Sequence, residues 1–299
     1  MGEGLPKEPT ISEELRARCR ATGEYRPMLF EWYKHVSLLA NLFASIRGDS
    51  PGLRAMPPVH YAVLVGLLNR CSRLMFASVA LSHEGLFGET TAIVDRCVFE
   101  SCVKLSWLCS QAVPDAFERF FAEGLKTELE LEEEIKAKIE ARHGAVQNIE
   151  RRMLESIERA IASTGLTREQ VARAKKLPDM AAMLTAIGHR RLAYVVGQRL
   201  GSHHVHGTWV SLRLHYLEAG ADGLLRPRDH DCETHVNQYL LVPQAVLAAM
   251  SSFLEFTVPD RNVAAPFETA VRSAEKQIHE LGVELSGADF DAVDAAIAE

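Results

Sequence analysis

The chain has 299 residues, of which 47% are hydrophobic and 24% are charged, proportions that are ordinary for a globular protein with a packed core. Its formal net charge of -7 argues against a protein that coats nucleic acid non-specifically, because such a protein needs a broadly basic face. The polar N-terminus lacks an apolar segment and the longest apolar runs fall short of a membrane span, so we expect a cytoplasmic protein with no signal peptide and no membrane partner.

The pattern along the chain predicts an all-α fold. Strand signals are almost absent, and apolar residues recur every three or four positions between short breaks that contain Gly or Pro. We expect a helical bundle with a long charged helical arm, an N-terminal helical extension (1–54), a bundle domain (55–257) and a C-terminal helical tail (258–299). The predicted helices cover residues 12–21, 28–47, 57–84, 88–112, 180–199, 203–218, 231–256 and 267–283, with a weak last helix at 288–298 and a loop at 219–230.

Residues 114–164 form the predicted arm, and they differ in composition from the rest of the chain. They are highly charged, and their apolar residues keep only a narrow helical stripe. This stripe predicts one long helix, or two helices with a break at Gly144. Because so narrow a stripe is difficult to bury in a monomer, we expect a twofold homodimer that uses residues 125–161.

The densest chemistry lies between Met180 and Leu217, a stretch without a single Asp or Glu. An acidic protein that keeps one acid-free, cationic segment is expected to form a local site for an anion, and phosphate is the obvious candidate. The Arg and His residues of this stretch are Arg190, Arg191, Arg199, Arg213, His189, His203, His204, His206 and His215.

Gly201 and Ser202 are expected to separate two helices, with Gly201 in a left-handed cap and Ser202 as the N-cap of the second helix. The histidines that follow would then lie at a helix N-terminus, where the dipole favours an anion and a neutral imidazole. Arg199, one turn upstream, can bind a phosphate in a bidentate manner. A neutral His can accept the proton of a 2′-hydroxyl, so this pair is a minimal set of groups for cleaving RNA without a metal.

The spacing from Arg199 to His204 or His206 resembles the Arg-(4 to 6 residues)-His motif of the HEPN superfamily. In addition, AIVDRCVFESCVKLSWL (92–108) followed by YVVGQRLGSHHVHGTW (194–209) is similar to an uncharacterised family of bacterial helical proteins, a domain of unknown function. Members of that family have an Arg-x-x-x-Glu helix before a Tyr…Ser-x-x-x-His element. The likeness spans roughly residues 60–220.

The HEPN resemblance implies a small helical bundle and, as in many members, a metal-independent endoribonuclease of a toxin–antitoxin or antiviral defence system, with the site commonly formed across a dimer. We therefore expect RNA or a nucleotide as the ligand, no cofactor, an inhibitor or antitoxin as a further partner, and no DNA-specific recognition. His206 is the preferred general base, His204 is the runner-up, and Arg199 would bind the phosphate. The residues expected to support or contact the substrate are Arg96, Glu100, Tyr194, Ser202, His203 and Trp209.

Three other interpretations stay open. The cluster could bind a nucleotide or another anion without cleaving it. It could be a metal site, because His203 and His206 point the same way on a helix and could share a metal with His83, Glu84, Glu89 or Glu100. It could also be purely structural, with the histidines as caps, Arg199 paired with Glu100, and Arg96 forming an internal ion pair with Glu100 four residues later.

Overall fold

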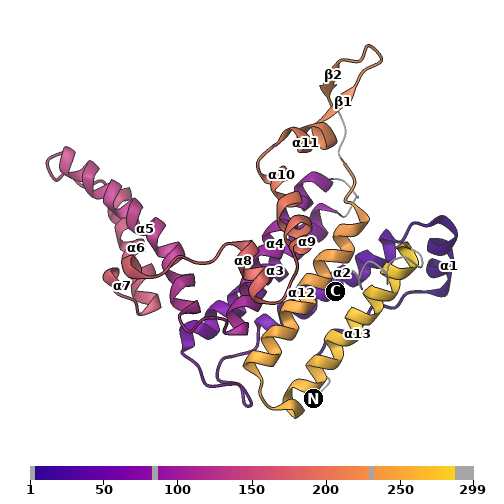
Figure 1. Ribbon diagram of the computed structural model, residues 1–299, viewed down its shortest axis with the longest axis horizontal. Coiled ribbons are helices and arrows are strands. Elements are labelled where there is room, and N and C mark those ends of the chain that lie inside the picture. The colour runs from indigo at the N-terminus through magenta and orange to yellow at the C-terminus, as the bar shows by residue number, and fades with distance from the viewer. Residues whose placement is uncertain (1–3, 83–86, 229–231, 287–299) are drawn as a thin grey trace.

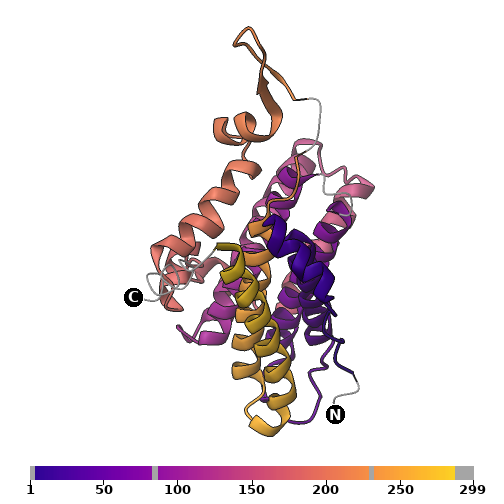
Figure 2. The same ribbon diagram turned by 90° about the vertical axis from the view of Figure 1, so that its right-hand side faces the viewer.

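The fold is an all-α bundle from which two segments project (Figures 1 and 2). It is known from a computed structural model that describes residues 4–82, 87–228 and 232–286, with the side chains of Arg199 and Leu200 outside the described part. Within that part, the only sheet is one short two-stranded hairpin. The all-α fold class predicted from the sequence is therefore confirmed.

The bundle is built from α2 (Arg26–Ala44), α3 (Pro58–Leu81), α4 (Gly88–Ser110) and α12 (Val236–Thr257). Pro57 and Pro58 start α3 at positions where a missing backbone donor costs nothing. Along α3 the buried residues follow helical spacing, as in Leu64, Leu68, Cys71 and Met75, so one face of the helix enters the core. The apolar period of the sequence thus becomes the packed face of each bundle helix.

The terminal helices belong to the same core. The helices α1 (Glu13–Thr22) and α13 (Arg261–Ser286) join through an ion pair of Arg20 with Glu284, at 2.8 Å. Both α2, which we placed in an N-terminal extension, and α13, which we placed in a tail, supply buried side chains to the main core. The boundary at residue 54 therefore does not coincide with a break in packing. The weak helix predicted at 288–298 lies outside the described residues.

Two bundle helices, α3 and α12, are long and apolar enough to cross a membrane by length and composition alone. This differs from the sequence analysis, which found no apolar run of sufficient length. In the bundle, 39% of the apolar window of α3 and 56% of that of α12 is buried. Both helices contribute to the main core, and packing of that kind is a usual reason for a helix to be apolar.

The charged arm is a helical hairpin of α5 (Ala116–Ala141) and α6 (Asn148–Thr164), followed by the short α7 (Arg168–Arg173). The break falls at His143 and Gly144, which both have positive φ (56° and 86°), so the two-helix alternative is correct. Part of the apolar stripe is buried within the arm itself, where Ile135, Ile157 and Ile161 form a second hydrophobic cluster, whereas Val146 and Ile149 stay exposed. The arm therefore buries much of this stripe without a partner chain, and the homodimer stays a prediction.

The second projecting segment departs most from the sequence analysis. Where we expected helices at 180–199 and 203–218 and a loop at 219–230, the chain forms short helical pieces and a hairpin. Gly188 (φ 84°) and Gly207 (φ 56°) interrupt it, whereas Gly201 stays helical. The elements are α8 (Met180–Ala186), α9 (Arg191–Tyr194), the π-helix η1 (Val195–Leu200), α10 (Gly201–Val205), α11 (Trp209–Ser211), the π-helix η2 (Leu212–Tyr216), β1 (Leu217–Ala219) and β2 (Leu225–Pro227), with β1 and β2 antiparallel.

Small residues let this segment lie directly on α4. A Cβ atom on Gly197 would come within 2.3 Å of the Phe99 ring, and one on Gly201 within 3.0 Å of the Cβ atom of Arg96. Gly201 is therefore required for close packing rather than for a left-handed cap. Both π-helices lie in this segment, and π-helical turns occur often at functional sites.

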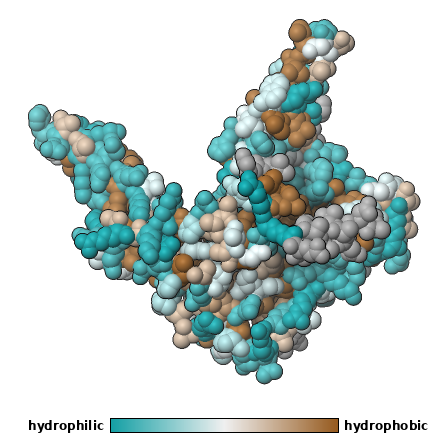
Figure 3. Space-filling view, viewed as in Figure 1, coloured by the Kyte–Doolittle hydropathy of each residue, from teal (hydrophilic) through white to brown (hydrophobic). Residues whose placement is uncertain are grey.

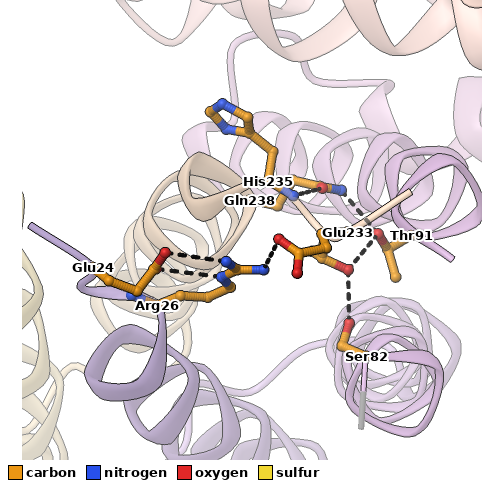
Figure 4. Close-up of polar contacts among 8 residues, drawn as sticks. Glu24, Arg26, Ser82, Thr91, Glu233, His235 and Gln238 are labelled. Atoms are coloured by element: carbon orange, nitrogen blue, oxygen red, sulfur yellow. Dashed lines mark hydrogen bonds and ion pairs between the residues drawn. The ribbon is translucent and has the colours of Figure 1, made fainter. Parts of the chain in front are cut away.

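A seam of polar contacts holds the start of α12, and the residues just before it, against the start of α2, the end of α3 and the start of α4 (Figure 4). Arg26 pairs with Glu233 at 2.6 Å, and the hydroxyl of Thr234 lies 3.1 Å from that of Ser82. Gln238 donates to Asp95, with 2.5 Å between its Nε2 atom and a carboxylate oxygen. Burial raises the pKa of the Asp95 carboxyl to about 7, although this hydrogen bond opposes the shift.

Replacing Gly88, at the start of α4, tests this seam. A Cβ atom there would lie 2.2 Å from the backbone oxygen of Glu233, so Gly88→Ala must displace backbone. We expect a loss of about 2 kcal/mol or more in the free energy of unfolding, measured by urea denaturation. The control is Gly66→Ala within α3, where nothing lies within 4 Å and we expect a gain of about 0.5–1 kcal/mol. A neutral Gly88→Ala variant would contradict the close contact.

The raised pKa of Asp95 makes stability depend on pH. Between the unfolded pKa, near 4, and about 7, the folded protein keeps a proton that the unfolded chain releases, so its contribution to stability falls as pH rises. We expect Asp95→Asn to lose this dependence. Its free energy of unfolding should rise relative to that of the wild type by on the order of 2 kcal/mol as the pH increases from about 5 to about 8. Parallel curves of urea midpoint against pH for the two proteins would contradict the assignment.

Candidate functional site

The candidate site is centred on two histidines of the projecting segment. The rings of His204 in α10 and His215 in η2 lie with their centroids 4.9 Å apart and their planes at 59°. Ser211 of α11 brings its hydroxyl to 3.4 Å from Nδ1 of His204. Three short elements, α10, α11 and η2, therefore bring two imidazoles and a hydroxyl together just before the hairpin.

The surroundings of His215 are charged and contain several buried polar atoms without hydrogen-bond partners in the described structure. Within the described residues, neither ring nitrogen of His215 has a hydrogen-bond partner, nor does Oε2 of Glu89 or Nε of Arg228, although all these atoms are buried. Arg228 donates through its NH1 atom to Sγ of Cys232 at 3.1 Å. Buried polar atoms are nearly always paired, so a group of unpaired ones marks a place for water or a ligand.

The protonation of the two histidines follows from this environment. Burial lowers the pKa of His204, and the nearby rings of His215 and His203 lower it further. Burial also lowers the pKa of His215, with the Glu89 carboxylate opposing the shift and the Arg228 guanidinium adding to it. Both imidazoles are therefore biased towards the neutral form near pH 7.

The reason for this neutrality is not the one expected from the sequence. Gly201 has φ -59° and continues from η1 into α10, and the hydroxyl of Ser202 donates to the backbone oxygen of Gln198 at 2.9 Å. Ser202 is thus not an N-cap, and His203 and His204 lie in the last turn of α10, away from a helix N-terminus. The predicted anion site at a helix start is wrong, because the chain breaks at Gly207 instead.

The other predicted residues of the segment take different places around this pair. His203 uses Nδ1 to share a hydrogen bond with the hydroxyl of Thr208, at 2.8 Å. His206 follows the end of α10 and is exposed. Tyr194 packs against the main core, whereas Trp209 is 61% exposed. Of the two candidate bases, the structure brings His204 rather than His206 to other titratable side chains.

The Arg-x-x-x-Glu pair of α4 does meet the projecting segment. Nε of Arg96 lies 3.1 Å from Oε1 of Glu100, and Nε2 of Gln198 donates to the same oxygen at 2.9 Å. Although burial opposes it, the hydrogen bonds from Gln198 and Arg96 lower the pKa of Glu100. The internal ion pair expected for Arg96 and Glu100 is confirmed, whereas the side chain of Arg199 lies outside the described part.

The donor set for a metal is sparse. In the parts of the chain that the structure describes, no three His, Cys, Asp or Glu side chains are grouped so that they could hold a metal ion. His83 and Glu84, which could have completed a shell around His203 and His206, lie outside the described residues. The metal interpretation therefore gains no ligand group from the described residues.

Sequence reasoning missed several members of the cluster. His215 was noted as part of the acid-free stretch. Because the chain breaks at Gly207, no helical spacing predicts that His215 lies beside His204. Glu89 and Arg228 lie far from it along the chain, at the start of α4 and after β2. Their proximity depends on the fold, so the only usable sequence signal was the Arg/His composition itself.

The fold and the site define an all-α bundle protein with a histidine pair on a segment that projects from the bundle. The chain belongs to a family of unknown function (DUF5677), whose model matches residues 61–224. No curated protein and no solved structure matches the chain. The matched region contains Glu89, the Arg96–Glu100 pair and both histidines, but it ends before Arg228.

The electrostatic coupling of the two histidines can be measured directly. Because the ring of His215 lowers the pKa of His204, we expect His215→Phe, which keeps an aromatic ring but has no charge, to raise that pKa towards 6.5. NMR titration of the imidazole protons reports the shift, with His279 on α13 as an internal reference. An unchanged titration of His204 would show that the two rings are not coupled.

Proposed function

We propose that this protein is a HEPN-like, metal-independent endoribonuclease that acts in defence or stress, with His204 and His215 as its acid–base pair. The observation that carries the proposal is the approach of the two ring centroids to 4.9 Å, among partly buried and charged side chains. Protonation of one imidazole disfavours protonation of the other, so two adjacent imidazoles tend to hold one proton between them. Such a pair suits a reaction that removes one proton and delivers another.

His204 is the proposed general base. In its neutral form it would take the proton of a 2′-hydroxyl, so that the 2′-oxygen attacks the adjacent phosphorus. Its distance in sequence from Arg199 matches the shorter Arg-to-His spacing of the HEPN motif, which was the second choice in the sequence analysis. We prefer it to His206, because His206 is exposed whereas His204 lies beside the ring of His215.

His215 is the proposed general acid. Burial lowers the pKa of His215 and Arg228 adds to this shift, while the nearby Glu89 carboxylate opposes it and so favours the protonated form that an acid needs. As an imidazolium it would donate a proton to the 5′-oxygen as the phosphorus–oxygen bond breaks. The products would be a 2′,3′-cyclic phosphate and a free 5′-hydroxyl, so the proton gained by His204 balances the one lost by His215.

Cationic and aromatic groups around the pair would hold the substrate. Arg228, with its buried and unpaired Nε atom, and Arg199, one turn before His204, would bind the phosphate and stabilise the negative charge of the transition state. Trp209 is exposed and offers a surface on which a base can stack. Arg96 and Glu100 would act as positioning residues, since Glu100 accepts hydrogen bonds from both Arg96 and Gln198.

A non-catalytic nucleotide- or anion-binding module is the second candidate function. The unpaired nitrogens of His215 and Arg228 favour it, because donors that face one phosphate can bind it without cleaving it. A binding module would be stabilised by nucleotides in a thermal-shift assay yet leave RNA intact, since a ligand of the native state raises apparent stability. The two functions therefore predict different results with the same purified protein.

The decisive assay incubates purified protein with a mixed RNA pool in EDTA. We expect cleavage with cyclic-phosphate ends by the wild type, and a loss of about 10²-fold or more for His204→Ala, His215→Ala and Arg199→Ala. The matched control is His206→Ala, which changes an exposed histidine of the same segment and should keep activity within about threefold.

The possible failures of this assay point in different directions. Equal cleavage by all variants would indicate a contaminating nuclease, and loss of activity in His206→Ala alone would restore the original choice of base. Cleavage that EDTA abolishes would favour the metal-dependent alternative. An inactive wild type whose melting temperature rises with nucleotides would favour the binding module.

A further inference from the structure

The two projecting segments differ in charge from the bundle that carries them. The end of the arm, residues 136–152, holds five Lys or Arg against two Glu, and we call it the arm tip. The second projecting segment, residues 195–228, holds four Arg against one Glu and one Asp, whereas the rest of the chain holds 24 Lys or Arg against 36 Asp or Glu. An acidic protein thus carries positive charge on both projections, which extend to the same side of the bundle in Figure 1.

Two arginines of the arm tip are free to bind an anion. Arg142 already pairs with a Glu of α6. The side chains of Arg151 and Arg152, by contrast, are exposed and make no ion pair or hydrogen bond within the described structure. Together with Asn148 they line one open hollow of about 400 Å³, because a spacing of three and four residues places them on one face of α6. Figure 3 shows a mostly hydrophilic surface at this end of the arm.

The part of the arm nearer the bundle has the opposite charge. Residues 118–134 of α5 hold seven Glu against one Arg and one Lys. At a rise of 1.5 Å per residue α5 is about 40 Å long, which is several times the Debye length of about 8 Å at physiological salt. The acidic bundle therefore has little effect at the arm tip, while the acidic half of α5 repels an anion. A polyanion that binds the arm is thus confined to the tip.

The chemistry of the arm tip suits phosphate groups rather than bases or lipids. No aromatic residue occurs in the sequence between Phe121 and Tyr194, and the tip, all of which the structure describes, exposes two large apolar side chains, Val146 and Ile149. Stacking on a base and anchoring in a membrane interface both use aromatic side chains. Guanidinium and amide groups, by contrast, donate hydrogen bonds that phosphate oxygens accept. The tip therefore fits a nucleic-acid backbone, bound without regard to base sequence.

We propose that the arm tip is a second RNA contact, in which Arg151 and Arg152 bind phosphates of a strand that also lies on the second projecting segment. The choice of RNA among polyanions rests on the proposed function. Once a strand is held at one projection, its binding to the other is an intramolecular step, so even weak phosphate contacts raise the affinity for long RNA. An RNA too short to reach both projections gains nothing from the arm.

Binding of 2′-O-methyl RNA tests the arm tip without cleavage, because this RNA lacks the free 2′-hydroxyl that the proposed reaction needs. Fluorescence anisotropy compares mixed-sequence strands of about 40 and about 6 nucleotides. We expect the double variant Arg151→Gln, Arg152→Gln to bind the long strand about tenfold more weakly than the wild type does, and the short strand within about twofold. For the long strand, the slope of log K against log salt should become shallower by about 1.4, since each phosphate contact on a single strand contributes about 0.7.

The matched control removes the same charge from the bundle. Arg272 and Lys276 of α13 have side chains that are 74% and 73% exposed, so Arg272→Gln, Lys276→Gln changes net charge as the arm-tip variant does. We expect this control to bind both strands within about twofold of the wild type. Both double variants should melt within a few degrees of the wild type, about the range expected of surface substitutions, which separates a lost contact from a lost fold.

Several outcomes would overturn the proposal. Equal losses in the two double variants would show that only net charge matters, and an arm-tip variant that weakens both strands equally, or neither, would remove the second contact. A wild type that binds neither strand at about 100 µM would do the same. An arm-tip variant that loses binding to phosphatidylserine vesicles but not to RNA would assign the tip to a membrane. The proposed function fails separately, since a wild type that cleaves no RNA but binds the long strand through Arg151 and Arg152 would keep the arm-tip contact.

Discussion

The site depends on one close contact, the packing of the segment 194–205 against α4. Gly197 and Gly201 allow this contact, because a side chain at either position would collide with Phe99 or crowd Arg96. With the backbone this close, Gln198 reaches Glu100, and α10 leaves α4 in the direction that brings His204 to His215. Gly201, which suggested a helix break in the sequence, thus allows close packing instead, and the position of the histidine pair depends on this packing.

Two polar clusters lie near this contact, and each keeps buried polar atoms that have no hydrogen-bond partner among the described residues. Around Glu100, the carboxylate accepts from both Arg96 and Gln198 and its pKa is lowered, but NH1 of Arg96 and Oε1 of Gln198 stay unpaired. Around His215, both ring nitrogens and a carboxylate oxygen of Glu89 lack partners. Unpaired buried groups are typical of a site that binds something, so both clusters are candidates for contact with a ligand. We give the histidines the chemistry because an imidazole can accept or donate a proton near pH 7, and Arg96 and Glu100 a positioning role because they already form an ion pair.

The sequence predicted the long helices well, because each has enough turns for its apolar period to be visible. The helices α3, α4 and α12 begin and end within a few residues of their predicted bounds, and the break at Gly144 divides the arm as one alternative foresaw. Residues 180–230 were predicted poorly, since short helical pieces, π-turns and a hairpin give no period of useful length. Electrostatic interactions such as that of Glu89 with His215 join distant segments, so no local pattern could reveal them. The composition of the acid-free stretch located the site, but not its geometry.

The apolar side chains beside His215 bear on the chemistry of the site. In the arm, Ile135 and Ile157 are buried by the fold of one chain, whereas Leu214 and Trp209 of the projection stay in solvent. His215 lies between Leu214 and Tyr216 in the sequence, so a molecule that binds over these side chains would also lower the solvation of its ring. Lower solvation disfavours the imidazolium form and strengthens the interaction with the Glu89 carboxylate. Binding at this part of the chain would therefore change the acid–base properties of the histidine pair.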